Sequence, residues 1–214
     1  MSNVELQNEM KKLYEEMQQH FYNINDFLDS LDFKSNDEYK RINRTYFLIS
    51  RKHYEAFLVL IDYKHHPSAF VLARTILETF VKSMYLESIV KPKNGIVNDF
   101  IMKENKFPKF YDMAKELESY QHPSGSKFEG FFNQLLKKEL ATYEKMSYLS
   151  HSSGKYLQEF NEKGLVNISK EDVFSLMKFM YKIFISNALF HLLAFEHFDE
   201  TKLLIKIYEK TLSS

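Results

Sequence analysis

The sequence contains no cysteine and, in 214 residues, only five glycines and four prolines. The absence of cysteine excludes disulfides and thiol chemistry, and it fits a reducing cytosol. So few glycines and prolines leave little material for the tight turns of an all-β fold. Hydrophobic residues make up 44% and aromatic residues 16% of the chain, which excludes an intrinsically disordered protein. The composition therefore predicts long helices around a sizeable core.

The chain also lacks net charge, because 29 basic residues balance 29 acidic ones. No global field attracts it to nucleic acid or to an anionic membrane, so any such binding must be local. The amino-terminal segment MSNVELQNEMKKLYEEM is polar and charged, unlike a signal peptide. The most apolar stretch, 174–195, is interrupted by polar residues, so we expect a cytoplasmic protein with no membrane span. These interruptions are Lys178, Lys182, Asn187 and His191.

Helical periodicity dominates, and the prolines and glycines fall between the periodic segments. The pattern predicts one all-α domain over residues 1–214, a bundle of about six or seven helices. Pro67 is expected in the first turn of the third helix, and Ser169 is expected to cap the sixth, with Asp172 completing a capping box. The first helix is amphipathic and packs either within the domain or against a second subunit. The predicted helical segments are 3–31, 37–64, 66–90, 96–120 (broken at Pro108), 126–151, 170–197 and a short terminal helix.

The apolar segment HPSAFVLARTILETFVKSMYL (66–86) carries an arginine and a glutamate, Arg74 and Glu78, in its interior. Since each helical residue advances by about 100°, Arg74 and Glu78 share a face with large apolar side chains. An arginine and a glutamate four residues apart can simply pair with each other. A buried guanidinium has more donors than one carboxylate satisfies, so we also expect groups from other helices to converge on Arg74. The opposite face, which we expect to be the wetter one, carries Thr75, Thr79, Lys82 and Ser83.

The inward face of the predicted fifth helix changes from aliphatic to polar near its end. The apolar stripe of Phe132, Leu136 and Leu140 continues through hydroxyl-bearing residues, and an imidazole lies beside it. In one interpretation these groups satisfy the last carbonyls of the helix. In the other they belong to a polar site with Arg74. The residues concerned are Tyr143, Ser147, Ser150 and His151.

Two polar residues of the sixth helix are also predicted to face inward. Asn187 and His191 each follow a lysine by nine residues, which is half a helical revolution. A single inward histidine is more often a core residue than a catalyst. Inward polar groups on three helices favour a shared site, to which we assign substrate binding by Tyr143, Ser147, Ser150, Asn187 and His191.

The segments SAFVLARTILETFVKSMYL (68–86) and YEKMSYLSHSSG (143–154) carry a resemblance. They resemble a family of uncharacterised bacterial helical proteins with Arg-x-x-x-Glu in one helix and a Ser/His element in a later one. That family in turn looks like a distant relative of the HEPN superfamily. Carried over by position, the resemblance covers residues 40–200 and picks out Arg74, Glu78 and His151 as catalytic, with Tyr143 and Ser147 beside them.

HEPN domains are helical, commonly dimeric and frequent in toxin–antitoxin and antiphage systems, and many are metal-independent ribonucleases. The resemblance therefore implies an HEPN-like homodimer that acts on RNA or a nucleotide. Those nucleases carry an arginine and a histidine at a short spacing that this chain does not reproduce: eight residues separate Arg44 from His53, and one separates Arg51 from His53. A composite site, in which Arg74 stabilises charge on phosphorus and His151 moves the proton, supplies the same chemistry.

The alternative function is a non-catalytic helical module that binds another protein, with Arg74 and Glu78 fixing the helix register. Phosphate-loop, dinucleotide-binding and nucleophile-elbow motifs are absent, and no Glu-x-x-His pair is present, so we expect neither a cofactor nor a metal. Basic residues cluster in the second helix, where they either contact RNA phosphates or form an ordinary solvated face. They are Lys40, Arg41, Arg44, Arg51 and Lys52.

Overall fold

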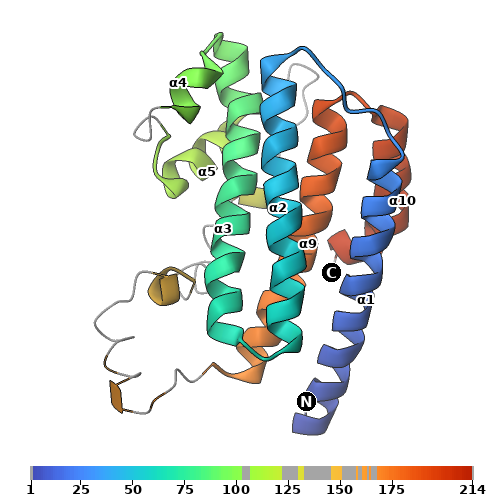
Figure 1. Ribbon diagram of the computed structural model, residues 1–214, viewed down its shortest axis with the longest axis vertical. Coiled ribbons are helices and arrows are strands. Elements are labelled where there is room, and N and C mark those ends of the chain that lie inside the picture. Colours follow the sequence, from blue (N-terminus) through green and yellow to red (C-terminus); the bar gives the residue numbers. More distant parts are fainter. Residues whose placement is uncertain are drawn as a thin grey trace.

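Long helices form the body of the molecule, as seen in a computed structural model (Figure 1). The structure describes residues 2–102, 107–121, 130–132, 146–150, 158, 161–162, 164 and 168–213. The five long helices of these segments are α1 (Asn3–Asp29), α2 (Glu38–Asp62), α3 (His66–Tyr85), α9 (Lys170–Ala194) and α10 (Phe198–Ser213). The predicted all-α fold is confirmed for the described residues.

The long helices lie side by side, and α1, α3 and α9 run in one direction while α2 and α10 run in the other (Figure 1). Two short helices, α4 (Val97–Ile101) and α5 (Phe110–Ser119), lie beside the carboxyl-terminal half of α3. They occupy the region that the sequence predicts as helical but broken at Pro108. α9 contacts α1, α2, α3 and α10, so it is the central helix of the described part.

Local signals in the sequence account for where several helices begin. The Ser2 and Glu5 side chains form a capping box at the start of α1. Asp37 accepts a hydrogen bond from the Lys40 backbone at the start of α2. Ser169 caps α9 by accepting from the backbone of Asp172, as predicted. These side chains satisfy amide groups that have no partner inside the helix.

The third helix ends in two irregular turns. Pro67 lies in its first turn as predicted, and after α3 the chain continues through a π-helical turn, η1 (Leu86–Val90), and a 3₁₀ turn, η2 (Lys91–Lys93). Asn94 then adopts a left-handed conformation with φ 53°. A Cβ atom at Gly95 would collide with the Val90 side chain, so glycine is required where the chain turns back. The predicted helix end near residue 90 is confirmed.

The core is rich in stacked aromatic rings. The Tyr54 ring of α2 stacks on Phe184 of α9, with ring centroids 4.3 Å apart, and Phe21 of α1 contacts both rings. This cluster joins the first helix to the central one. Of the two alternatives left open for the first helix, packing within the domain is therefore observed for its Phe21 face.

One face of α3 differs from the prediction. Thr79 and Ser83, assigned to the wetter side, are only 9% and 2% exposed. The Ser83 hydroxyl donates to Asn43 Oδ1 of α2 at 2.5 Å. The prediction was wrong because α2, α5 and α9 all pack against α3, so this helix is covered around most of its circumference.

Among the described residues, α9 alone is long and apolar enough to span a membrane by length and composition. Within the structure, 61% of its most apolar window is buried against other helices. A mostly buried helix of this kind is also the ordinary core helix of a globular bundle.

Candidate functional site

Within the described part of the chain, two side chains accept hydrogen bonds from Arg74 of α3. Its Nε donates to Glu78 Oε1, one turn further along α3, at 2.7 Å. Its Nη1 donates to Ser150 Oγ in the helical segment 146–150, also at 2.7 Å. Ser150 Oγ in turn donates to the backbone oxygen of Ser147 at 3.2 Å. The partner from another helix that the sequence predicts for Arg74 is therefore present. We call Arg74, Glu78 and Ser150 the Arg74 centre.

The Arg74 centre lies at the edge of the core. The side chain of Arg74 is 17% exposed and that of Glu78 is 30% exposed. Solvent screening weakens such a pair relative to a fully buried one. The same partial exposure leaves the centre within reach of a ligand from solvent, and the two hydrogen bonds restrict the orientation of the guanidinium plane.

Of the site residues predicted at the end of the fifth helix, two lie outside the described residues. These are Tyr143 and His151. Ser147 is described and half-buried, and its contribution at the Arg74 centre is a backbone carbonyl. The structure therefore brings together Arg74, Glu78, Ser147 and Ser150 from the predicted set.

Asn187 and His191 face inward as predicted, with exposures of 2% and 3%, but they lie on the side of α9 that meets α2. The His191 ring stacks on Phe47, with ring centroids 4.4 Å apart and planes 4° apart. Phe33 lies on it at 4.3 Å. His191 is thus enclosed by aromatic rings and is not part of the Arg74 centre. Helical periodicity predicts that His191 faces inward, but it does not show which inward groups His191 meets.

The aromatic enclosure changes the acid–base behaviour of His191. Burial, together with the nearby positive charge of Arg44, lowers the pKa of its imidazole from 6.5 to about 3. The ring is therefore neutral at physiological pH. A neutral imidazole in an aromatic environment is typical of a core residue.

A second polar cluster, not predicted from the sequence, joins α1, α9 and α10. The Tyr181 hydroxyl donates to Glu16 Oε1 at 3.0 Å and also contacts His20 Nδ1. The His20 ring packs edge-on against Tyr208 of α10 at 4.7 Å. Since the single phenolic proton goes to Glu16, His20 Nδ1 must carry the proton of the second bond, which leaves its Nε2 as the unprotonated nitrogen.

Burial shifts the pKa values of this cluster. It raises the pKa of Tyr181 well above its usual value, and it lowers the pKa of His20, an effect that Glu16 partly offsets. The spacing of Glu16 and His20, four residues apart on α1, was the only sequence signal for the cluster. Nothing in the sequence pointed to Tyr181 as their partner.

A third polar cluster lies where α2 meets the end of α3. Asn43 Nδ2 donates to Glu87 Oε2 at 2.7 Å, and Asn43 Oδ1 accepts from Ser83. Lys91 Nζ donates to Glu87 Oε1 at 2.5 Å. Glu87 lies in the π-helical turn η1, and turns of this type are frequent at functional sites. Here the carboxylate is held by an amide and an ammonium group of its own chain, which favours a structural role.

The basic residues of α2 are largely matched by acidic ones. Arg51 forms a two-pronged contact with the Asp29 carboxylate, with distances of 2.7 and 2.8 Å. That hydrogen-bonded guanidinium lowers the pKa of Asp29. The ion pairs Lys40–Glu196 and Lys52–Glu55 measure 3.2 and 3.1 Å. This pairing favours the solvated-face interpretation over an RNA-binding patch.

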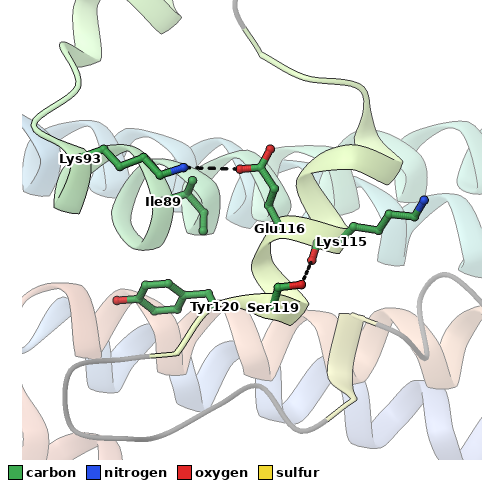
Figure 2. A pocket seen from close by; sticks show the side chains of 6 residues that line it. All are labelled: Ile89, Lys93, Lys115, Glu116, Ser119 and Tyr120. Atoms are coloured by element: carbon green, nitrogen blue, oxygen red, sulfur yellow. Dashed lines mark hydrogen bonds and ion pairs between the residues drawn. The ribbon is translucent and has the colours of Figure 1, made fainter.

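A shallow pocket opens between the η1–η2 turns and α5, with a volume of about 360 Å³ (Figure 2). Lys93 points toward Glu116, at 3.9 Å, whereas Lys115 points away from both. Tyr85 also donates to Glu116, at 3.1 Å. Burial, together with this contact, raises the pKa of Tyr85 to about 12. The charged side chains of the lining therefore do not converge on one point. The residues that line the pocket are Ile89, Lys93, Lys115, Glu116, Ser119 and Tyr120.

No group of three or more histidine, aspartate and glutamate side chains in the described segments is arranged to hold a metal ion. Comparison with known proteins yields no relative: no family model matches the sequence, and no curated protein or solved structure is significantly similar to it.

Proposed function

We propose that this chain is an HEPN-like bacterial protein whose Arg74 centre binds a phosphate group of RNA or of a nucleotide. The observation that supports the proposal is the guanidinium of Arg74, oriented from two helical segments and still 17% exposed. A planar guanidinium matches the geometry of phosphate oxygens, and its charge strengthens the hydrogen bonds it donates.

The proposed reaction is metal-independent cleavage of RNA. The 2′-hydroxyl of the substrate attacks the adjacent phosphorus, the bond from phosphorus to the 5′-oxygen breaks, and a 2′,3′-cyclic phosphate forms. Arg74 stabilises the added negative charge on the phosphoryl oxygens. His151, the residue that follows Ser150 in the chain, takes the hydroxyl proton and returns it to the leaving 5′-oxygen. Glu78 acts as a positioning residue for the guanidinium.

The cellular role that we propose is based on the HEPN resemblance alone. It places the protein in the cytoplasm as a homodimer, in a toxin–antitoxin or antiphage system. Light scattering coupled to size-exclusion chromatography measures the molar mass in solution and tests the dimer directly. A monomeric mass across the working concentration range contradicts this part of the proposal.

The test of catalysis uses the full-length protein and fluorescently labelled single-stranded RNA in buffer with a metal chelator. We expect wild-type protein to cleave, and His151→Ala and Arg74→Met to reduce the rate at least about 100-fold, the usual scale for loss of a general acid–base or charge-stabilising group. The matched control is Arg51→Met, which removes an arginine–carboxylate pair between α2 and the end of α1. Absence of cleavage by folded wild-type protein, together with absence of RNA binding, refutes the proposal.

The second candidate is a non-catalytic module that binds another protein. The observation that favours it is charge matching: Glu78 compensates Arg74, and acidic partners compensate Lys40, Arg51 and Lys52. In that case RNA is neither bound nor cleaved. Expression of His151→Ala then affects bacterial growth as wild type does, whereas a toxic nuclease loses its effect on growth.

A further inference from the structure

Four buried polar side-chain atoms in the seam between α2 and α9 have no hydrogen-bond partner within the described part of the chain. One is Tyr54 Oη, one turn from Ser50 on α2, and the other three are Ser50 Oγ, Asn187 Nδ2 and His191 Nδ1. These last three residues are 1%, 2% and 3% exposed. A buried polar group without a partner destabilises the folded state, and native proteins satisfy such groups with protein atoms or with ordered water.

Two stacked ring pairs determine where these residues lie relative to one another. Phe47 of α2 stacks on His191 of α9, with ring centroids 4.4 Å apart. Tyr54 of α2 stacks on Phe184 of α9 at 4.3 Å. Ser50 lies between the two aromatic residues on α2, and Asn187 lies between Phe184 and His191 on α9. Since the two helices are antiparallel (Figure 1), Ser50 and Asn187 occupy the same level of the seam.

The spacing on α9 suits a single small bridging molecule. Asn187 and His191 are four residues apart, which is a rise of about 6 Å along a helix. Two hydrogen bonds of about 2.8–3.0 Å through one oxygen atom span that distance. Ser50 approaches the same level from α2, so a third bond is available from the facing helix.

The chemistry of the three atoms selects the kind of molecule. Asn187 Nδ2 is a donor, the Ser50 hydroxyl donates and accepts, and a neutral imidazole has one nitrogen that accepts. Burial keeps the His191 ring neutral, since its pKa is about 3. A water molecule has two donors and two acceptors, so it complements all three atoms. A cation is disfavoured by the donor amide and by the nearby positive charge of Arg44.

We propose that Ser50, Asn187 and His191 form an internal binding site for a water molecule that bridges α2 and α9. This site is separate from the Arg74 centre and does not depend on the proposed function. It reassigns Asn187 and His191 from substrate binding to hydration of the core. The bridging water holds the two helices in register at a level where neither helix supplies the other with a direct hydrogen bond.

The test is nuclear magnetic resonance of the full-length, isotope-labelled protein. We expect cross-relaxation of opposite sign from that of surface water between bound water and the side-chain amide protons of Asn187, which indicates a long-lived water. Ser50→Ala should weaken this signal, and Ser50→Ala with His191→Phe, which keeps the Asn187 amide protons, should abolish it. The exposed Asn23→Ala serves as the matched control and should leave the signal intact.

The wild-type spectrum alone decides the outcome if a variant does not fold. Absence of the water signal at Asn187, with its amide protons otherwise visible, overturns the proposal. So does a chloride-dependent shift of those protons that saturates, because it assigns the position to an anion. In the variants, the ring-current shifts at Phe47 and at residue 191 report whether the seam remains packed.

Discussion

Arg74 and Ser150, 76 residues apart in the chain, are joined by a 2.7 Å hydrogen bond from Nη1 to Oγ. The serine hydroxyl simultaneously donates to the Ser147 carbonyl of its own helix. It is therefore a donor to its own helix and an acceptor for the arginine. This arrangement anchors segment 146–150 to α3 through one cation. It also makes the orientation of the guanidinium depend on both segments.

That bond is expected to be energetically measurable. Ser150→Ala should lower the free energy of unfolding by about 1 kcal/mol, the scale of a hydrogen bond to a partly exposed charged group. Urea unfolding of wild type, Ser150→Ala, Arg74→Met and the double variant gives the coupling between the two side chains. Equal effects of Ser150→Ala in the presence and absence of Arg74 contradict the prediction. The Arg51–Asp29 pair, with Asp29 60% exposed, is the matched control and should contribute less.

The lowered pKa of His191 predicts that the folded protein becomes less stable as the pH falls. Its pKa is 6.5 in the unfolded chain and about 3 in the folded protein, so below pH 6.5 the unfolded state binds more protons. Stability is therefore fully present above that pH and falls as pH decreases toward 3, by up to about 1.4 kcal/mol per pH unit.

Urea unfolding at several pH values between 7 and 4 checks this dependence for His191. His191→Phe retains a stacking ring without a titrating group, so its unfolding free energy should vary less with pH. His65→Gln, at an exposed position, should leave the contribution of His191 in place. An unchanged pH dependence in His191→Phe shows that other groups cause the acid sensitivity.

The Tyr181 hydroxyl is expected to hold α1 against α9. Tyr181→Phe removes its bonds to Glu16 and His20 and should lower the unfolding free energy by about 1–3 kcal/mol. It should also change the imidazole nitrogen shifts of His20, because Nδ1 loses its acceptor. Tyr22→Phe, at a 52% exposed ring, is the control. Unaltered His20 shifts in Tyr181→Phe rule out the assigned proton arrangement.

Asn43 is expected to be the central residue of the polar cluster between α2 and α3. Asn43→Ala leaves Ser83 and Glu87 without the partner they share, and we expect a loss of about 2–4 kcal/mol. The measurement is chemical unfolding combined with amide hydrogen exchange at the end of α3, which should become faster. Asn23→Ala, on the exposed face of α1, should have little effect on either quantity. If both asparagine variants behave alike, the cluster has no stabilising role.

Local interactions explain why part of the molecule could be predicted from the residues alone. Ser169 caps α9 and Pro67 starts α3 because their side chains act within one helical turn. The need of Arg74 for a second partner also followed from the chemistry of one side chain. The two helix starts involve neighbours in the chain, and the need of Arg74 for a partner follows from its own donors, so neither required knowledge of the packing. The identity of that partner, Ser150, did require it.

The residues that pack against each helix could not be predicted in the same way, because they come from segments distant in the sequence. Helical periodicity grouped Ser83 with Lys82 on a wet face, yet packing of α2 against α3 buries Ser83 beside Asn43. Periodicity likewise turned His191 inward without showing that the interior there consists of Phe33 and Phe47. The sequence by itself determined the helices and their apolar faces, since these follow from backbone hydrogen bonding and side-chain spacing. Only the tertiary structure decided which polar groups meet, since a helix face acquires its chemistry from the neighbour that covers it.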